Sequence, residues 1–431
     1  MKPARWIGVG AVLGAGAALA VAVAHSANDM SAYGQLRLFS DAMSKVRANY
    51  VDPVKDEDLV KSAVQGMVSK LDPHSGYMDA KSFGGEFQSR TQGRFGGVGI
   101  QVAPDEGAIK VISPMDGMPA AAAGIKPGDK ITAINGTAVG QDFSASIDRM
   151  RGPVGTKVTL TVQREGEKPF DVTVVRADVP IDATTSRREG DVAYIRMPGF
   201  NEKTAEGLEK AVRDLKKQIG TGLKGYILDL RNNPGGLLDQ AIQVSDDFLV
   251  SGEIVSTRGR QSDDTQRYDA KSGDITGGKP IIVLINAGSA SASEIVAGAL
   301  QDHKRATILG MTSFGKGSVQ TILPLGEKRG ALRLTTARYY TPSGHSIQAQ
   351  GIVPDIQVAQ GNETEMPKIL RRSEADLEGH LAGEPVSAKR AEAPLIQAAP
   401  GTKYDDFQLA YALDLLRGTM TVASVTKKQA G

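Results

Sequence analysis

Cysteine is absent from the 431 residues of this chain, so neither a disulfide nor a thiolate metal site can contribute to the fold or the chemistry. The five histidines are scattered without ligand-like spacing, and we expect no metal. Neither sign of charge dominates: 51 basic and 49 acidic residues leave a net charge of +2, which gives no reason to expect a nucleic-acid partner. Any chemistry therefore has to use hydroxyl, amine, carboxylate or amide groups.

The amino terminus has the pattern of an export signal. Lys2 and Arg5 precede an uncharged run rich in alanine and glycine, residues 6–24, whose end, Ala22–Ala24, offers a small-x-small cleavage site. The run is also just long enough to span a bilayer if it is not cleaved. We therefore expect residues 1–27 to be a signal peptide or a membrane anchor. The remaining chain would be exported, either periplasmic or anchored at the outer face of the cytoplasmic membrane.

Three patterns follow one another along the chain. Residues 33–92 carry helical periodicity and include a turn in which we interpret His74 as a packing residue rather than a functional one. Residues 93–178 form short strand patterns separated by glycine turns. Residues 179–358 alternate strands with helices, and the apolar run 281–285 is typical of a strand buried on both faces. The predicted helices of this last region and of the carboxyl terminus span residues 204–217, 238–248, 292–300 and 404–417.

The last part of the chain changes in composition. Residues 360–403 are rich in Glu, Ala, Pro, Lys and Arg, which predicts a flexible linker. Segment 404–419 recovers an apolar helical face through residues such as Phe407 and Leu409. A helix on a mobile tether has to bury that face. We expect it to pack on the amino-terminal helices of a second copy, which would make the protein a homo-oligomer such as a dimer.

A glycine-rich stretch, Gly310–Ser318, departs from a phosphate-binding loop at one position. Such a loop needs a hydroxyl directly after its lysine and a helix after that, whereas Gly317 follows Lys316 and the next residues alternate like a strand. We therefore reject a nucleotide site. A lysine kept neutral in a dry pocket can act as a general base, and glycines let backbone pack closely around its amine. The alternative is a solvated lysine in a surface turn.

Ser289, Ser291 and Ser293 lie at the predicted start of a helix, directly after a buried strand. A serine in that position can act as a nucleophile, because the following amides and the positive end of the helix can stabilise an oxyanion. Helix capping explains these serines equally well from this stretch alone. In the loop after another strand, Gly235 and Gly236 either supply a second oxyanion donor or form a plain turn.

Gly97, Val98, Gly99 and Ile100 lead into a strand of the β-rich module. Consecutive amides in such a loop can capture a chain-terminal carboxylate while the strand pairs with the peptide, although glycines also serve plain turns. The segment Ser113–Val139 resembles the middle of a PDZ domain, whose A-G-[IL]-x-x-G-D string it matches without a gap. The resemblance implies a domain over residues 93–178 that binds carboxyl-terminal peptides, with residues 97–100 lining the carboxylate loop.

From the helical region to Val358, the chain resembles the carboxyl-terminal processing proteases, also called tail-specific proteases. The motifs that carry the resemblance are N-x-x-[ST]-A-S-A-S-E around Ser291 and F-G-K-G-x-x-Q around Lys316. Lys316 follows Ser291 by 25 positions, and Gln320 lies four residues further on. The resemblance implies Ser291 as the nucleophile, Lys316 as the general base and Gln320 as the side chain that orients the lysine.

The same resemblance assigns further roles. Ala292 and one of Gly235 or Gly236 would supply the oxyanion donors. Arg151, at the end of the PDZ helix, would couple peptide binding to alignment of the protease site. The implied fold class is α/β: residues 179–358 would form a crotonase-like open α/β protease core, with the PDZ domain inserted ahead of it and a helical amino-terminal region.

We therefore expect a serine endopeptidase that recognises the carboxyl-terminal tails of extracytoplasmic proteins through its PDZ domain. It would cleave them by a Ser/Lys acyl-enzyme mechanism and need no cofactor. An exported PDZ scaffold without catalysis is one alternative, but it would not need Ser291, Lys316 and Gln320 together. A crotonase-like acyl-transfer enzyme that uses coenzyme A is another, and it would have no obvious use for the PDZ-like segment.

Overall fold

The computed structural model describes residues 32–80, 82–105, 107–140, 142–271, 273–326, 329–360, 372–384, 393–398 and 404–419. The predicted signal or anchor, residues 1–27, lies outside them. Within the described residues, none of the helices combines the length and the apolar character that crossing a membrane requires. The chain divides into two compact units, Met1–Lys70 and Leu71–Gly431.

The first unit is helical in its described part, as its periodicity predicts. Residues 32–49 form one helix, and α2, Asp56–Ser69, forms a second. Three acidic residues in the first turn of α2 favour that end of the helix because its free amides carry partial positive charge. The predicted helical region 33–92 also contains elements of the second unit: β1 (Gly76–Met78), a π-helical turn (Ser82–Phe87) and α3 (Gln88–Gln92). A strand as short as β1 leaves no alternating pattern to detect.

The β-rich module forms a sheet in the order β3-β4-β5-β7-β8, with β6 beside β5. Its strands are β3 (Ile100–Asp105), β4 (Ala108–Pro114), β5 (Lys130–Ile134), β6 (Thr137–Ala138), β7 (Lys157–Gln163) and β8 (Phe170–Val175). The short α4 (Pro119–Ala122) and the amphipathic α5 (Phe143–Met150) complete a core in which Val111, Ile131 and Leu160 are fully buried. Two strands at the ends of the module, β2 (Arg94–Gly97) and β9 (Ala177–Pro180), pair with each other. Because β3 lies at the edge of the sheet, one side of its backbone is open for pairing.

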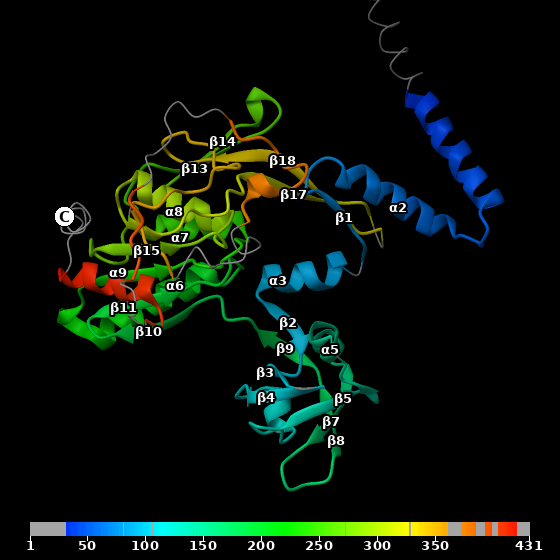
Figure 1. The fold of residues 1–431 in the computed structure, drawn as a ribbon, viewed down its shortest axis with the longest axis horizontal. Coiled ribbons are helices and arrows are strands. Elements are labelled where there is room, and N and C mark those ends of the chain that lie inside the picture. The colour runs from blue at the N-terminus through cyan, green and yellow to red at the C-terminus, as the bar shows by residue number, and fades with distance from the viewer. Residues whose placement is uncertain are drawn as a thin grey trace, which may run out of the picture. The chain divides into compact units, whose positions relative to one another are not determined.

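A six-stranded sheet forms the centre of the α/β domain (Figure 1), in the order β10-β11-β12-β15-β16-β19. All neighbouring pairs are parallel except β10 with β11. Every residue of β12 and β15 is buried, as the apolar runs predict. The strands are β10 (Thr185–Glu189), β11 (Val192–Arg196), β12 (Gly225–Asp229), β15 (Ile281–Ile285), β16 (Thr307–Gly310) and β19 (Ile356–Gln357).

Three helices, α6 (Thr204–Ile219), α7 (Leu238–Asp246) and α8 (Ala292–Asp302), share one hydrophobic core with this sheet. The helices α7 and α8 also contact β13 of a second, antiparallel sheet with the order β1-β18-β13-β14, in which β17 pairs with β18. Its strands beside β1 are β13 (Glu253–Arg258), β14 (Gln266–Asp269), β17 (Ser318–Pro324) and β18 (Ala331–Tyr340). Residues Ala292–Gln301 of α8 are all buried, which places the start of α8 deep in the domain.

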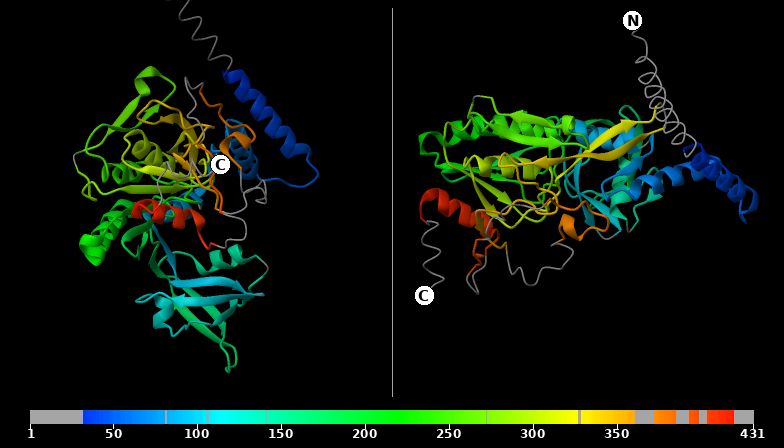
Figure 2. Two further views of the ribbon diagram at one scale, coloured as in Figure 1. Left: turned by 60° about the vertical axis from the view of Figure 1, so that its left-hand side comes forward. Right: turned by 90° about the horizontal axis from the view of Figure 1, so that it is seen from above.

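The carboxyl-terminal helix α9, Phe407–Arg417, covers another part of the main sheet (Figure 2). Its buried side chains Leu409, Tyr411 and Ala412 join a core formed by strands β11, β12, β15, β16 and β19, separate from the core under α6 to α8. The prediction that this face packs on a second copy is therefore wrong, because the chain's own sheet buries it. Homo-oligomerisation by other surfaces stays a prediction.

The described parts of the predicted linker, residues 360–403, are folded on the core. Residues Glu374–Asp376 form a 3-10 turn whose first residue is 1% exposed, and Ile396 bridges Val358. The flexible-linker prediction is wrong for these parts, while residues 361–371, 385–392 and 399–403 lie outside the described residues. Short segments that dock mainly through polar contacts have no apolar period, which explains why composition misled the prediction.

Candidate active site

Ser291 occupies the junction between β15 and α8, where a buried parallel strand gives way to a helix. It is the N-cap residue of α8, with φ 55° and ψ −114°, and is 8% exposed. Non-glycine residues rarely take a positive φ, and such strain is typical of functional positions. The same junction is where catalytic groups of parallel α/β sheets usually lie.

The three serines of this junction have different environments. Ser289 and Ser293 are fully buried, and their hydroxyls donate to the carbonyls of Leu230 at 2.8 Å and Asn233 at 3.0 Å. They tie the junction to the loop that follows β12. Both hydroxyls thus donate to backbone carbonyls, whereas no carbonyl of the described residues accepts from the Ser291 hydroxyl.

Gly235 lies directly against Ser291, since a Cβ on Gly235 would come within 2.8 Å of the serine Cβ and 2.9 Å of the Ala292 nitrogen. The Gly235 amide itself donates to Asn233 Oδ1 at 2.8 Å. The amides of Gly236 and Ala292, in contrast, have no acceptor among the residues that the structure describes. These two amides are therefore the candidate oxyanion donors, and Gly235 supplies the close approach between the two loops.

Glu294 joins the Ser291 junction to the Lys316 loop and is fully buried. Its Oε2 accepts the backbone amides of Ser291 at 2.7 Å and Lys316 at 2.9 Å. Its Oε1 accepts the amide of Gly315 at 2.7 Å and the hydroxyl of Ser313 at 2.5 Å. Burial raises the pKa of Glu294 to about 7 against the opposing effect of these hydrogen bonds. Sequence analysis gave this residue no role, although the Ser-x-x-Glu spacing of a capping box could have identified it.

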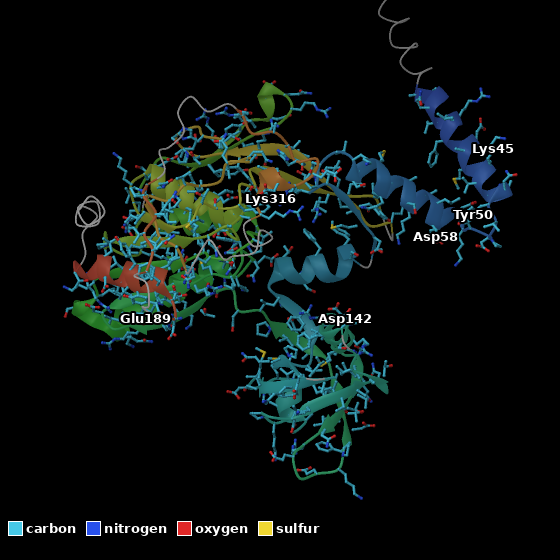
Figure 3. The ribbon with its side chains drawn as sticks, in the orientation of Figure 1. Lys45, Tyr50, Asp58, Asp142, Glu189 and Lys316 are labelled. Carbon is cyan, nitrogen blue, oxygen red and sulfur yellow. The ribbon has the colours of Figure 1, made fainter. Side chains whose placement is uncertain are left out.

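Lys316 lies in the loop between β16 and β17 and is labelled in Figure 3. Burial lowers the pKa of its amine and Arg333 lowers it further, whereas the carboxylates of Glu374, Glu294 and Asp72 oppose the shift. Within the described residues, no hydrogen bond joins this amine to the Ser291 hydroxyl. The two residues are linked through the Glu294 carboxylate, which accepts the backbone amides of both. The described part of the chain contains no group of three or more His, Asp or Glu side chains that could hold a metal ion.

Gln320 lies on β17, and its Nε2 donates to Ser318 Oγ at 2.9 Å and Thr335 Oγ1 at 3.2 Å. In the described residues it has no hydrogen bond to Lys316, so its orienting role stays a prediction.

Tyr339, on β18, contacts the nucleophile candidate and has no counterpart in the sequence analysis. Burial raises the pKa of its phenol, while a hydrogen bond with Ser291 lowers it. The phenol is therefore protonated at neutral pH and able to donate to the serine oxygen. Nothing in the spacing of Tyr339 from the serine motif indicates this contact, which depends on the pairing of β18 with its neighbours.

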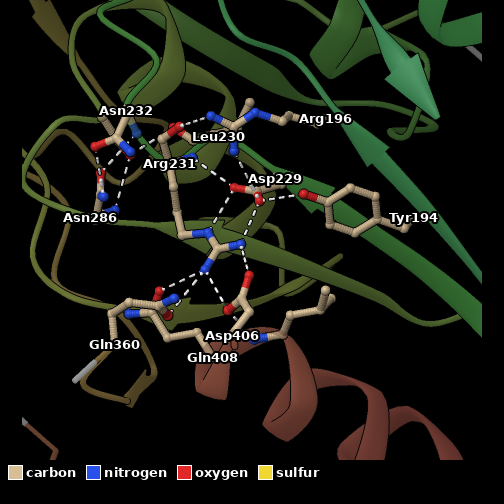
Figure 4. A network of polar contacts seen from close by, with 12 residues as sticks. Tyr194, Arg196, Asp229, Leu230, Arg231, Asn232, Asn286, Gln360, Asp406 and Gln408 are labelled. Atoms are coloured by element: carbon tan, nitrogen blue, oxygen red, sulfur yellow. Dashed lines mark hydrogen bonds and ion pairs between the residues drawn. The ribbon is translucent and has the colours of Figure 1, made fainter. Parts of the chain in front are cut away.

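A buried network holds the strand end ahead of the Gly235–Gly236 loop (Figure 4). Arg231 pairs with Asp229 Oδ2 at 2.6 Å and with Asp406 Oδ2 at 2.7 Å. Tyr194 donates to the same Asp229 oxygen at 2.7 Å, and Gln408 accepts from Arg231 at 3.0 Å. Because Asp406 is the N-cap of α9, the network fastens the carboxyl-terminal helix to the strand end that precedes the Gly235–Gly236 loop.

The predicted carboxylate loop, residues 97–100, connects β2 to β3. Val98 is buried and its carbonyl accepts the amide of Ala120 at 2.9 Å. Gly99 has φ 73°, and a Cβ there would lie 2.3 Å from that of Met118. The amides of Val98 and Gly99 have no acceptor among the described residues, and the open edge of β3 follows directly. This arrangement has the free donors and the strand edge that capture of a peptide end requires.

Arg151, the predicted coupling residue, follows α5 and is about half exposed. Its guanidinium lies 4.9 Å from the centre of the Phe95 ring and 3.6 Å from Asp148 Oδ1. The structure thus places it beside β2, and its coupling role stays a prediction.

Comparison with protein families gives three matches. Residues 191–358 match the model described as Peptidase family S41, residues 110–164 match the PDZ domain, and residues 15–82 match the activating protease CtpB N-terminal domain. The first two lie inside the predicted protease core and PDZ domain.

Similar proteins carry processing-protease names. The chain is 52% identical over 401 residues to the carboxy-terminal-processing protease of Bartonella bacilliformis, covering 92% of each chain. It is 36% identical over 333 residues to the carboxy-terminal processing protease CtpA of Bacillus subtilis, covering 76% of this chain and 69% of the relative. A solved structure titled photosystem II D1 C-terminal processing protease aligns with 29% identity and a TM-score of 0.45, over 74% of this chain and 92% of that one.

These matches confirm the predicted family, its α/β fold with a PDZ domain, and the serine peptidase class. They also set aside the non-catalytic scaffold and the coenzyme A enzyme. The chain belongs to peptidase family S41 and is a serine peptidase of the carboxy-terminal-processing type.

Proposed function

We propose that this protein is an exported serine endopeptidase that binds the carboxyl-terminal tail of extracytoplasmic proteins and cleaves them with a Ser291/Lys316 dyad. The observation that carries the proposal is the convergence of the Ser291 junction and the Lys316 loop on the buried carboxylate of Glu294. That carboxylate accepts one backbone amide from each of the two loops and so supports their function as one site.

The proposed chemistry starts from a neutral lysine amine, which burial favours. The amine takes the proton from Ser291 Oγ as this oxygen attacks the scissile carbonyl carbon. The amides of Gly236 and Ala292 stabilise the resulting oxyanion. Lys316 then passes its proton to the departing amine, the acyl-enzyme forms, and a water activated by the same lysine releases the acid. Before this proton transfer, the serine hydroxyl exchanges its hydrogen bond with Tyr339 for one to Lys316. Gln320 is proposed to orient the lysine.

Tail recognition is assigned to the PDZ domain. The amides of Val98 and Gly99 would bind the terminal carboxylate, and the edge of β3 would pair with the peptide. Arg151 is proposed to couple this binding to the protease site. The amino-terminal pattern of residues 1–27 supports a location in the periplasm or at the outer face of the cytoplasmic membrane.

The test uses an unfolded reporter protein with a free apolar tail, and the same reporter with an amidated tail. We expect the wild-type chain to cleave the first much faster, and Ser291→Ala and Lys316→Ala to lose at least about a thousandfold in kcat, as is usual when a nucleophile or its base is removed. The exposed residues Ser251 and Lys216 provide matched controls as alanine variants. Retained cleavage by a folded Ser291→Ala variant would reject the dyad. Equal cleavage of both reporters would reject recognition of the tail carboxylate.

A further inference from the structure

The segment 372–384, beyond the protease core, is docked beside the Lys316 loop by side chains that reach its backbone. We call it the C-terminal strap; it is orange in Figure 1. Gln348 donates to the carbonyl of Leu381 at 3.0 Å, and Gln350 donates to that of Glu384 at 2.9 Å. At its start, the amide and hydroxyl of Ser373 both donate to one carboxylate oxygen of Asp376, at 2.8 and 2.7 Å, and thereby close a 3-10 turn.

Glu374 is the buried centre of the C-terminal strap, 1% exposed. Its Oε2 lies 2.7 Å from His74 Nε2, its Oε1 accepts from Gln348 Nε2 at 3.0 Å, and its amide donates to the carbonyl of Phe314 at 2.9 Å. Burial alone would raise the pKa of Glu374, but the hydrogen bonds from His74 and Gln348 hold it below its usual range. A buried charge is tolerated only with such partners, so the contacts fix an ionised carboxylate at this place.

These contacts enclose the Lys316 loop from both sides. Phe314, which accepts the Glu374 amide, lies two residues before Lys316. Gln348, which donates to the Glu374 carboxylate, accepts the amide of Gly317 through its own Oε1 at 3.1 Å. The C-terminal strap therefore holds the lysine loop at two places: directly at Phe314, and through Gln348 at Gly317.

Four charged groups act on the Lys316 amine, one from each surrounding element. Arg333 comes from β18, Glu294 from α8, Asp72 from the turn before β1, and Glu374 from the C-terminal strap. Asp72 and Glu294 each accept four hydrogen bonds from backbone and hydroxyl donors. Glu374 and Asp72 both come from outside the protease core, residues 179–358, and Glu374 is the carboxylate that follows the core in the chain and pairs with His74.

We propose that Glu374 is a positioning residue for Lys316: the docked strap fixes the lysine loop and holds a buried, ionised carboxylate against it. This inference rests on the proposed function, which makes Lys316 the general base. A carboxylate near an ammonium group favours the charged form. Removing the charge of Glu374 therefore makes the neutral amine available at lower pH, while the shape of the loop is kept by an isosteric side chain.

The test follows the pH dependence of Ser291 acylation in the full chain, measured as the burst of p-nitrophenol that leaves when a p-nitrophenyl ester acylates the serine. Glu374→Gln keeps the size of the side chain and removes its charge, and Glu374→Asp keeps the charge. Glu378→Gln is the matched control, because it neutralises an exposed carboxylate of the same strap. On the acid side of the plot of acylation rate against pH, which we call the acid limb, we expect the Glu374→Gln curve to lie about half a pH unit lower than that of the wild type. At a given pH on this limb, acylation is then about threefold faster. The Glu374→Asp and Glu378→Gln profiles should keep the wild-type acid limb.

The outcomes separate this inference from the proposed function. A wild-type chain that is not acylated at Ser291 would refute the function itself. Normal acylation with superimposed acid limbs for wild type and Glu374→Gln would overturn the inference and leave the function standing. If thermal unfolding shows that Glu374→Gln does not fold, His74→Gln carries the test. Loss of the imidazole removes the side chain that holds the Glu374 carboxylate at 2.7 Å, so this acid limb should move in the same direction as that of Glu374→Gln, and an unmoved limb would overturn the inference.

Discussion

Replacing Glu294 with glutamine is the sharpest test of how the site is held together. The carboxylate accepts four hydrogen bonds, two on each oxygen, and is fully buried. Glutamine offers one oxygen and a donating NH₂ group, so two of the four donors face another donor. A buried donor that loses its acceptor costs about 1–3 kcal/mol, and two such losses amount to about 2–6 kcal/mol of unfolding free energy.

The activity of Glu294→Gln should fall with the stability, because the four donors come from both halves of the site: one from the Ser291 junction and three from the Lys316 loop. Loss at Oε2 releases the amides of Ser291 and Lys316, and loss at Oε1 releases the loop ahead of the lysine. We expect kcat on a tailed reporter to drop at least about a hundredfold, with KM little changed, because small displacements of positioned groups cost that much.

Urea unfolding and steady-state kinetics measure both effects of Glu294→Gln. Glu206→Gln is the control, because it alters an exposed glutamate in a surface pair with Lys203 that is worth about 1 kcal/mol or less. If Glu294→Gln matched the wild type in both unfolding free energy and kcat, the bridging carboxylate would have no part in assembling the dyad.

Three further predictions concern other parts of the molecule. Asp247 has an unpartnered buried oxygen, and burial, Glu209 and Asp246 raise its pKa to about 7. Because the unfolded chain releases this proton near pH 4 and the folded chain only near pH 7, the folded state loses stability as the pH rises through this range. Asp247→Asn should therefore raise the unfolding free energy by about 1–3 kcal/mol at pH 8 and by little at pH 4. Urea titrations of both proteins at the two pH values measure the difference. Asp406→Asn should weaken the pairing with Arg231 and lower the unfolding free energy by about 2–4 kcal/mol, with Asp405→Asn as the exposed control; equal urea midpoints would contradict it. Gly99→Val should abolish binding of a carboxyl-terminal peptide in fluorescence titrations while acylation of Ser291 by the p-nitrophenyl ester persists, because the left-handed backbone and the nearby Met118 exclude a Cβ.

Much of the architecture follows from patterns that the sequence carries locally. The predicted helices 204–217, 238–248 and 292–300 correspond to α6, α7 and α8, and the apolar run 281–285 is β15. Long segments of this kind reveal their period because one face or both faces are buried along their whole length. The junction that presents Ser291 was predictable for the same reason, since it lies where such a strand meets such a helix.

The parts that were missed depend on contacts between distant segments. Glu374 lies 58 positions after Lys316, in a segment whose composition predicts a linker, and its burial depends on single partners such as His74 and Gln348. His74 was interpreted as a packing residue, although it contacts the carboxylate beside the lysine. Polar contacts of this type have no period and no fixed spacing, so the sequence does not show them.

The arrangement around Lys316 also explains why an amine that must be neutral is surrounded by carboxylates. Burial favours the neutral amine. The loop around the lysine contains Gly315 and Gly317, which have no side chains of their own to hold it, so partners from other elements fix its backbone. Glu294 anchors the loop from α8 and Glu374 anchors it from the C-terminal strap. Each anchor is a carboxylate, whose two oxygens can accept hydrogen bonds from several donors at once. The negative charge of each carboxylate also raises the pKa of the lysine amine and thereby opposes its neutral form.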